Sequence, residues 1–179
     1  YHEDTYRHSY RVALICAYLS NFEHLNINSL DLLIPAGIFH DIGKLKISKA
    51  LLDKPGELTP KEKRVVYQHV RLGYLILCKD FQKPELAEII CYHHEHTDKG
   101  YPRREERRCV PRGFEVRRSN NPLFMKLGEI VAFADMYDAL RSKRSYKPAY
   151  SIEKVAEIMK KQFKGDLIYL DQLVKINSN

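Results

Sequence analysis

The chain has 179 residues, of which 44% are hydrophobic and 30% are charged, so one globular domain over residues 1–179 is expected. No stretch approaches the ~20 consecutive apolar residues of a membrane-spanning helix, and the composition also excludes a collagen, a disordered tail and a small disulfide-stabilised protein. Lysine and arginine exceed aspartate and glutamate by 30 − 23 = 7, which favours an anionic partner.

Apolar residues recur at steps of three and four along most of the chain, which predicts an all-α fold of about six or seven helices. Asn28 or Ser29 is expected to cap the second helix, and Gly43 is expected to end it. Thr59 and Ser151 are the expected N-caps of two later helices. In chain order the expected helices cover residues 5–24, 30–41, 59–78, 84–94, 123–140, 151–163 and a short segment from 166, with one further helical turn at 48–53.

The segment between the fourth and fifth expected helices stands out by its charge. Residues 103–121, a basic loop insertion, hold seven arginines and three glutamates, an excess of 7 − 3 = 4 within the chain's net charge of +7. Such a stretch is typical of a solvated loop, and it is also a candidate docking surface for an anionic partner. Because only Phe114 and the flanking Phe124 could stack on bases, nucleic acid is not expected as a partner.

The cysteines and the start of the chain bear on its location. The four cysteines have no C-x-x-C spacing, so reduced thiols and a cytoplasmic location are expected. No signal segment opens the chain, and its first residue is Tyr1 and not Met. We therefore expect the cytosolic part of a longer protein, with no membrane contact from this segment.

Seven histidines and aspartates fall on apolar stripes or at the ends of five different expected helices. Each one alone is more often a hydrogen-bonded core residue, but buried carboxylates are costly unless they are paired or bind a metal, and together the seven predict a metal site. Imidazole and carboxylate donors without cysteine suit Fe, Mn, Zn or Co. Seven donors exceed what one catalytic ion takes from a protein, so two ions are expected, bridged by the carboxylate of the adjacent His40-Asp41 pair. The seven residues are His8, His40, Asp41, His69, His93, His94 and Asp135.

Several short segments in order add to this pattern. They are His8-Ser9-Tyr10-Arg11-Val12, His40-Asp41-Ile42-Gly43-Lys44, residues 52–59, His69 with Gly73, His93-His94-Glu95, Gly100-Tyr101-Pro102, residues 135–140 and Arg144-Ser145-Tyr146-Lys147. With them the chain resembles the HD superfamily of metal-dependent phosphohydrolases over about residues 4–165, and most of all its HD-GYP branch of cyclic di-GMP phosphodiesterases. One departure is the GYP loop, which is one residue shorter than the family pattern and lacks one glycine.

The resemblance implies an HD-domain helical bundle around two divalent ions, commonly iron or manganese, with zinc, nickel or cobalt as alternatives. It implies that the seven residues are metal ligands, that Asp41 bridges the ions and that Lys44 is the active-site lysine. The resemblance also implies that four residues bind the substrate: Lys44, Tyr101, Arg144 and Lys147. A third ion in the family is bound with a glutamate four residues before the first histidine, where this chain has the shorter Asp4, so two ions are the expectation.

The reaction expected from the resemblance is hydrolysis of a cyclic dinucleotide such as cyclic di-GMP, an anionic nucleotide, by a hydroxide that bridges the two metal ions. Two alternatives stay open because the GYP loop departs from the family pattern. One is another HD phosphohydrolase that acts on a mononucleotide, a ppGpp-like compound or an RNA end. The other is a non-catalytic signalling module that binds a ligand or a signalling protein through the GYP loop and the basic segment.

Overall fold

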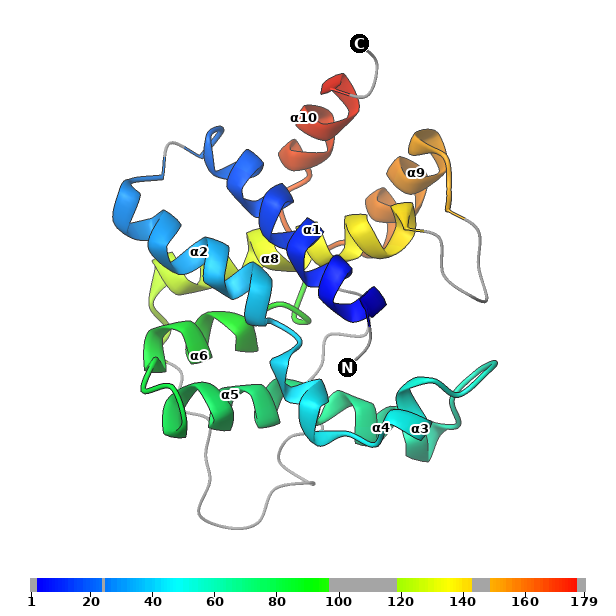
Figure 1. The fold of residues 1–179 in the computed structure, drawn as a ribbon. Coiled ribbons are helices and arrows are strands. Elements are labelled where there is room, and N and C mark those ends of the chain that lie inside the picture. Colours follow the sequence, from blue (N-terminus) through cyan, green and yellow to red (C-terminus); the bar gives the residue numbers. More distant parts are fainter. Residues whose placement is uncertain (1–2, 24, 97–118, 143–148, 177–179) are drawn as a thin grey trace.

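A computed structural model of the chain describes residues 3–23, 25–96, 119–142 and 149–176, without the side chains of residues 3, 4 and 174–176 (Figure 1). No strand occurs in these ranges, so the expected all-α class is confirmed. In chain order the elements are α1 (Glu3–Ser20), α2 (Ile27–Phe39), the 3-10 helix η1 (Ile42–Lys46), α3 (Lys49–Leu52), α4 (Pro60–Tyr67), α5 (His69–Lys79), α6 (Pro84–Cys91), α8 (Pro122–Arg141), α9 (Ile152–Gln162) and α10 (Ile168–Ile176).

Helix α8 is the centre of the core. It packs against α1, α2, α6 and α9, and its side chains from Ile130 to Ala134 are buried. The ring of Phe133 lies 5.4 Å from Phe163 and 5.2 Å from Tyr169, centroid to centroid, which ties α8 to the C-terminal helices. A helix buried on most sides is apolar around most of its circumference, and this explains why the long run from Leu127 to Ala134 is almost uncharged.

Two of the expected helix starts are confirmed, and one is wrong. The side chain of Thr59 accepts the N–H of Glu62 in a capping box, and that of Ser151 accepts the N–H of Lys154. The second helix, however, begins after Asn26, whose Oδ1 accepts the N–H of Ser29 at 2.9 Å. Ser29 also donates its hydroxyl to Asn26 at 3.0 Å. It lies buried within the first turn of the helix and does not cap it.

The ends of the second and third expected helices also differ from the prediction. Helix α2 stops at Phe39, and Gly43 lies inside η1, where the chain tightens and Lys44 N–H donates to Asp41 O at 2.9 Å. The expected helix at 59–78 divides into α4 and α5 at Gln68. There the N–H of Gln68 bonds to Val65 O, three residues back, instead of four, and this tighter turn interrupts the α-helical pattern.

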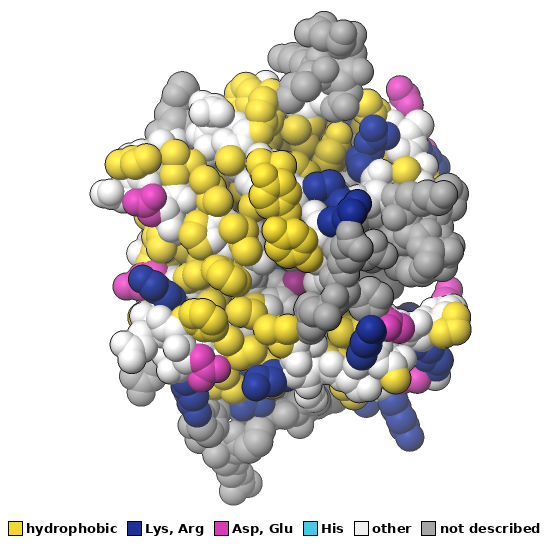
Figure 2. Space-filling model, in the orientation of Figure 1, with side chains coloured by type: hydrophobic (Ala, Val, Ile, Leu, Met, Phe, Trp, Pro, Cys, Tyr) yellow, Lys and Arg dark blue, Asp and Glu magenta, His cyan; other side chains and the backbone are white. Residues whose placement is uncertain are grey.

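On the face shown in Figure 2, hydrophobic side chains gather over α1 and α2, and the charged side chains in view are of both signs. In the described ranges no helix is both long and apolar enough to cross a membrane. Residues 103–118 of the basic segment lie outside the described residues, and the single domain over 1–179 stays a prediction.

Candidate metal centre

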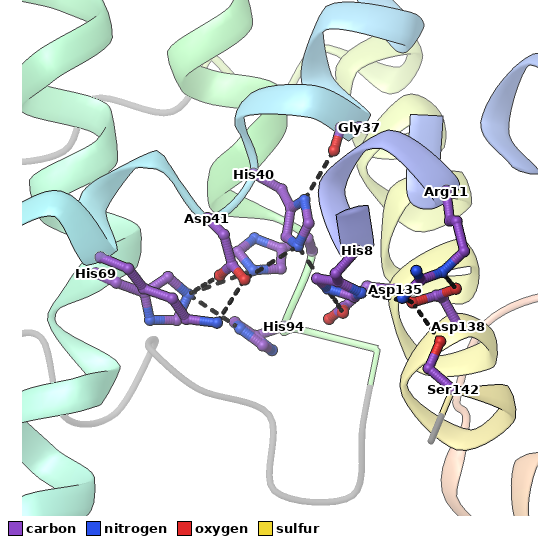
Figure 3. A network of polar contacts seen from close by, with 12 residues as sticks. His8, Arg11, Gly37, His40, Asp41, His69, His94, Asp135, Asp138 and Ser142 are labelled. Carbon is purple, nitrogen blue, oxygen red and sulfur yellow. Dashed lines mark hydrogen bonds and ion pairs between the residues drawn. The ribbon is translucent and has the colours of Figure 1, made fainter. Parts of the chain in front are cut away.

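The seven predicted residues come from five parts of the fold that meet at one place. His8 lies in α1 and Asp135 in α8, while His40 and Asp41 follow the end of α2. His69 begins α5, and His93 with His94 follows the end of α6. Figure 3 labels six of the seven, all except His93, and shows these side chains facing one another between the helices. The structure thus brings together all seven residues, which are up to 127 positions apart in sequence (135 − 8 = 127).

One half of the site is formed by His8, His40 and Asp41, whose possible ligand atoms all lie within 4.8 Å of one another. His40 Nε2 is 3.4 Å from Asp41 Oδ2 and 3.8 Å from Asp135 Oδ1. His8 Nε2 is 3.1 Å from the same oxygen of Asp135. Asp135 therefore lies beside this group. With Asp135 included, this half of the site has two imidazoles and two carboxylates.

The other half is formed by His69, His93 and His94, whose ligand atoms also lie within 4.8 Å of one another. The Nε2 atom of His69 is 3.5 Å from that of His93 and 3.2 Å from that of His94. It is also 3.3 Å from Asp41 Oδ1. Because Oδ2 of Asp41 faces His40 and Oδ1 faces His69, this one carboxylate reaches both halves of the site.

The hydrogen bonds of the imidazoles show that the donor set fits a cation. The Nδ1 atoms of His40, His69 and His93 each lie 2.5–2.9 Å from the main-chain carbonyl oxygen three residues earlier. A carbonyl only accepts, so we assign Nδ1–H to these rings, and the neutral ring then has its lone pair on Nε2. Among the described residues, the buried Nε2 of His40 has no hydrogen-bond partner. Lone pairs that converge in this way are matched by a metal ion.

The site combines neutral imidazoles with an ionised carboxylate. Burial lowers the pKa of His69 to about 4, and burial together with the neighbouring imidazoles lowers that of His93 to about 3. These rings are therefore neutral, as a metal ligand must be. Burial would raise the pKa of Asp41, but the Lys44 ammonium and His40 outweigh it and hold that pKa well below its usual range. Lys44 donates directly to Asp41 Oδ2.

His8 is the exception among the histidines. Burial would lower its pKa, but hydrogen bonds to Asp135 and Asp138 outweigh burial and raise the pKa to about 9. In the metal-free protein His8 is thus an imidazolium between two carboxylates at neutral pH. Its Nδ1 lies 2.7 Å from Asp138 Oδ2, and Arg11 donates Nε to Asp138 Oδ1 at 2.6 Å. Sequence reasoning gave neither Asp138 nor Arg11 a role.

Three of the four predicted substrate contacts fall outside the described part of the chain. Tyr101, Arg144 and Lys147 are not among the described residues, and the side chain of Asp4 is not described either. Of the predicted residues other than the seven, Lys44 is the one that the described structure places, and it lies at the site next to Asp41.

Known proteins match most of this chain. A sequence model of the HD domain matches residues 5–140. The chain is 34% identical over 157 residues to 3'3'-cGAMP-specific phosphodiesterase 2 of Vibrio cholerae, and the aligned part covers 86% of this chain and 27% of that protein. It is 34% identical over 154 residues to a cyclic di-GMP phosphodiesterase of Thermotoga maritima (84% of this chain, 38% of that protein). A cyclic di-GMP phosphodiesterase of Pseudomonas aeruginosa is 32% identical over 151 residues (83% and 33%).

The matched part is therefore between about a quarter and two fifths of the length of these relatives. All seven residues of the site lie within residues 5–140, which the HD domain model matches. The chain belongs to the HD domain family, and its resemblance to the HD-GYP branch is confirmed.

Proposed function

We propose that this chain is a metal-dependent phosphodiesterase that hydrolyses a cyclic dinucleotide. The observation that carries the proposal is the position of Asp41 between two groups of histidines. Its Oδ2 lies 3.4 Å from His40 Nε2, and its Oδ1 lies 3.3 Å from His69 Nε2. A carboxylate with one oxygen toward each of two imidazole groups suits a pair of ions that share it. The names of the relatives, which are cyclic di-GMP and 3'3'-cGAMP phosphodiesterases, support the substrate class.

The proposal assigns the ligands to two divalent ions, iron or manganese. His8, His40 and Asp135 would hold one ion and His69, His93 and His94 the other, with Asp41 shared between them. When bound, such a pair of ions activates a water molecule and stabilises negative charge on the phosphoryl oxygens. The proposal needs two ions; a third ion bound with Asp4 is not expected, because that carboxylate is shorter than the glutamate of the family.

Lys44 is the described cation that serves the reaction in this proposal. Its ammonium contacts Asp41, and its side chain is 27% exposed, so it is reached from solvent as well as from the site. A cation in this place neutralises charge on a bound phosphate and can supply a proton to the leaving 3′-oxygen. Tyr101, Arg144 and Lys147 are proposed to bind the nucleotide and its phosphates.

The test is product analysis with protein loaded with Mn²⁺ or, without oxygen, with Fe²⁺. Cyclic di-GMP and 3'3'-cGAMP are supplied separately, together with mononucleotide and RNA-end substrates. We expect a linear dinucleotide from at least one cyclic dinucleotide, and its loss in His40→Ala and Asp41→Asn. Glu157→Gln is the control, because Glu157 is an exposed carboxylate paired with Lys154 and Lys161 on α9. A protein that binds two ions and cleaves no cyclic dinucleotide would contradict the proposal.

The relatives also suggest how to define the substrate within this class. Some are named as specific for 3'3'-cGAMP and others as cyclic di-GMP phosphodiesterases. The ratio of kcat/KM values for the two cyclic dinucleotides decides between them, since this ratio measures differential binding of the two transition states.

A further inference from the structure

Asp138 is a buried carboxylate of α8 that is held by three side chains beside the candidate metal centre (Figure 3). His8 Nδ1 lies 2.7 Å from Oδ2. Arg11 donates Nε to Oδ1 at 2.6 Å and Nη2 to Oδ2 at 3.0 Å. Ser142, just after the end of α8, donates its hydroxyl to Oδ2 at 3.1 Å. Four hydrogen bonds on two oxygens fix the orientation of this carboxylate.

The network in turn fixes the imidazole of His8. With Nδ1 held by Asp138, the opposite nitrogen Nε2 is directed at Asp135, whose Oδ1 is 3.1 Å away. In His40, His69 and His93 the Nδ1 atom bonds a main-chain carbonyl instead. His8 differs from these three rings because a side chain sets its orientation, and a side chain can be changed by substitution.

Arg11 gives this arrangement its rigidity. His8 and Arg11 are three residues apart on α1, so both side chains lie on the same face of the helix and reach the same carboxylate of α8. The planar guanidinium donates twice to Asp138, which a lysine cannot reproduce. The contact between α1 and α8 is thus made by polar groups at the point where these two helices bring His8 and Asp135 together.

We propose that Asp138 is a positioning residue that acts through His8 to form the ion site of His8, His40, Asp135 and the shared Asp41, with Arg11 holding Asp138 in place. The inference takes the presence of two ions from the proposed function, but it does not depend on the substrate. The side chain of Asp138 hydrogen-bonds His8, Arg11 and Ser142. None of these bonds joins Asp138 to His69, His93 or His94, so loss of the Asp138 carboxylate is expected to weaken the ion held by His8 and not the other ion.

The substitution Asp138→Asn tests this directly. An asparagine has about the same shape, but one of its two polar groups is a donor, so it cannot accept from both His8 and the fork of Arg11. Purified full-length chain is loaded with Mn²⁺, its metal content is measured by elemental analysis, and the two affinities are measured by competition with a chelating indicator. We expect one ion to bind roughly tenfold to a hundredfold more weakly, as is usual when a group behind a ligand is lost, and the other to keep its affinity. Wild-type affinity for both ions would overturn the proposal, and so would an equal loss of both.

A second measurement separates action through His8 from a structural role. If Asp138 acts through His8, Asp138→Asn adds no further loss of metal affinity in a His8→Ala background. A further loss there would overturn the proposal. Glu157→Gln, which removes an exposed carboxylate of α9, is the control and keeps both ions.

A third variant covers the case in which Asp138→Asn does not fold without metal, as judged by circular dichroism. Arg11→Lys keeps the positive charge and loses the fork. It is expected to weaken the same single ion by several fold, and unchanged binding would overturn the proposal. All of these experiments measure metal affinity, so they test the role of Asp138 even in a protein that cleaves no cyclic dinucleotide. Absence of cleavage with normal metal binding counts against the proposed function alone.

Discussion

Gly43 is the position at which the smallest change is expected to damage the metal centre. It lies in η1, two residues after Asp41, where η1 packs on the first turn of α5. A Cβ at this position would overlap the carbonyl oxygen of His69 and lie 2.5 Å from the nitrogen of Gly73. Both obstacles are main-chain atoms, which cannot rotate away, so Gly43→Ala must push η1 off α5.

The structure gives the size of this displacement. Ordinary contact begins near 3.4 Å, so the nitrogen of Gly73 alone requires a shift of 3.4 − 2.5 = 0.9 Å. The same shift of Asp41 would lengthen its 3.3 Å contact with His69 Nε2 to at most 3.3 + 0.9 = 4.2 Å. Overpacking of this kind costs about 1–3 kcal/mol of the free energy of unfolding. For a chain of this length that lowers Tm by about 2–12 °C.

The assay compares Gly43→Ala with Gly56→Ala. At Gly56 a Cβ would meet nothing within 4 Å, but φ is +85°, so alanine there costs about 1–2 kcal/mol through backbone strain alone. We expect both variants to melt earlier, and only Gly43→Ala to lose metal affinity, because Asp41 is the carboxylate between the two histidine groups. Wild-type affinity for both ions in Gly43→Ala would refute the reasoning, whatever its Tm.

Three further predictions concern the charges and the core. The metal-free protein is expected to be most stable near pH 6.5. The pKa values of His69 (about 4) and His93 (about 3) lie below the ordinary 6.5, so stability is lost as pH falls below 6.5, and the pKa of His8 (about 9) lies above it, so stability is also lost as pH rises from 6.5 to 9. Denaturant unfolding with a chelator at pH 5–9 checks this, and a free energy of unfolding that rises steadily to pH 9 would contradict it. Lys44→Met is expected to keep both ions and to lower kcat by about a hundredfold or more, since a cation beside the phosphate is lost. Single-turnover experiments measure the rate of cleavage, and an unchanged rate would assign Lys44 no part in the chemistry. Phe133→Ala is expected to cost about 3–5 kcal/mol, because its fully buried ring joins α8 to the C-terminal helices; urea unfolding gives the value, and a loss below 1 kcal/mol would show that the core closes around the cavity.

The parts of the fold that were predicted correctly are those set by neighbours in sequence. The capping box of Thr59 and the cap of Ser151 need only a side chain and an N–H group three residues later, so composition at those positions is sufficient. The early end of α2 and the division at Gln68 were not predicted. Both lie where η1 and α5 approach so closely that only a glycine fits at position 43. That approach is a tertiary contact, which periodicity along the chain does not contain.

The site shows the same division. The seven histidines and aspartates could be predicted together because polar groups on apolar stripes of several helices have one common explanation. Asp138 was missed, although a signal was present: it follows Asp135 by three residues, as Arg11 follows His8. These two spacings place Arg11 about one helical turn after His8, and Asp138 about one helical turn after Asp135. That the two pairs face each other depends on the packing of α1 on α8, which one sequence without relatives does not reveal.

The difference between His8 and the other rings follows from where each lies on its helix. The last four carbonyls of a helix have no N–H donor within it. Gly37 and Ile90 are among these in α2 and α6, as is Val66 in α4, and their oxygens are the ones that face Nδ1 of His40, His93 and His69. A histidine placed just beyond a helix end thus bonds a carbonyl that has no donor within that helix, and it turns its Nε2 toward the site.

His8 cannot use this device, because it lies inside α1, where the carbonyl oxygens already accept the N–H groups of the following turn. A ring in that position needs an acceptor from another element, and Asp138 of α8 supplies it. The carboxylate also raises the pKa of His8, so a metal ion must displace a proton there and not at the neutral rings of His69 and His93. The rings of the site are therefore positioned in two ways: helix ends position His40, His69 and His93, and a contact between α1 and α8 positions His8.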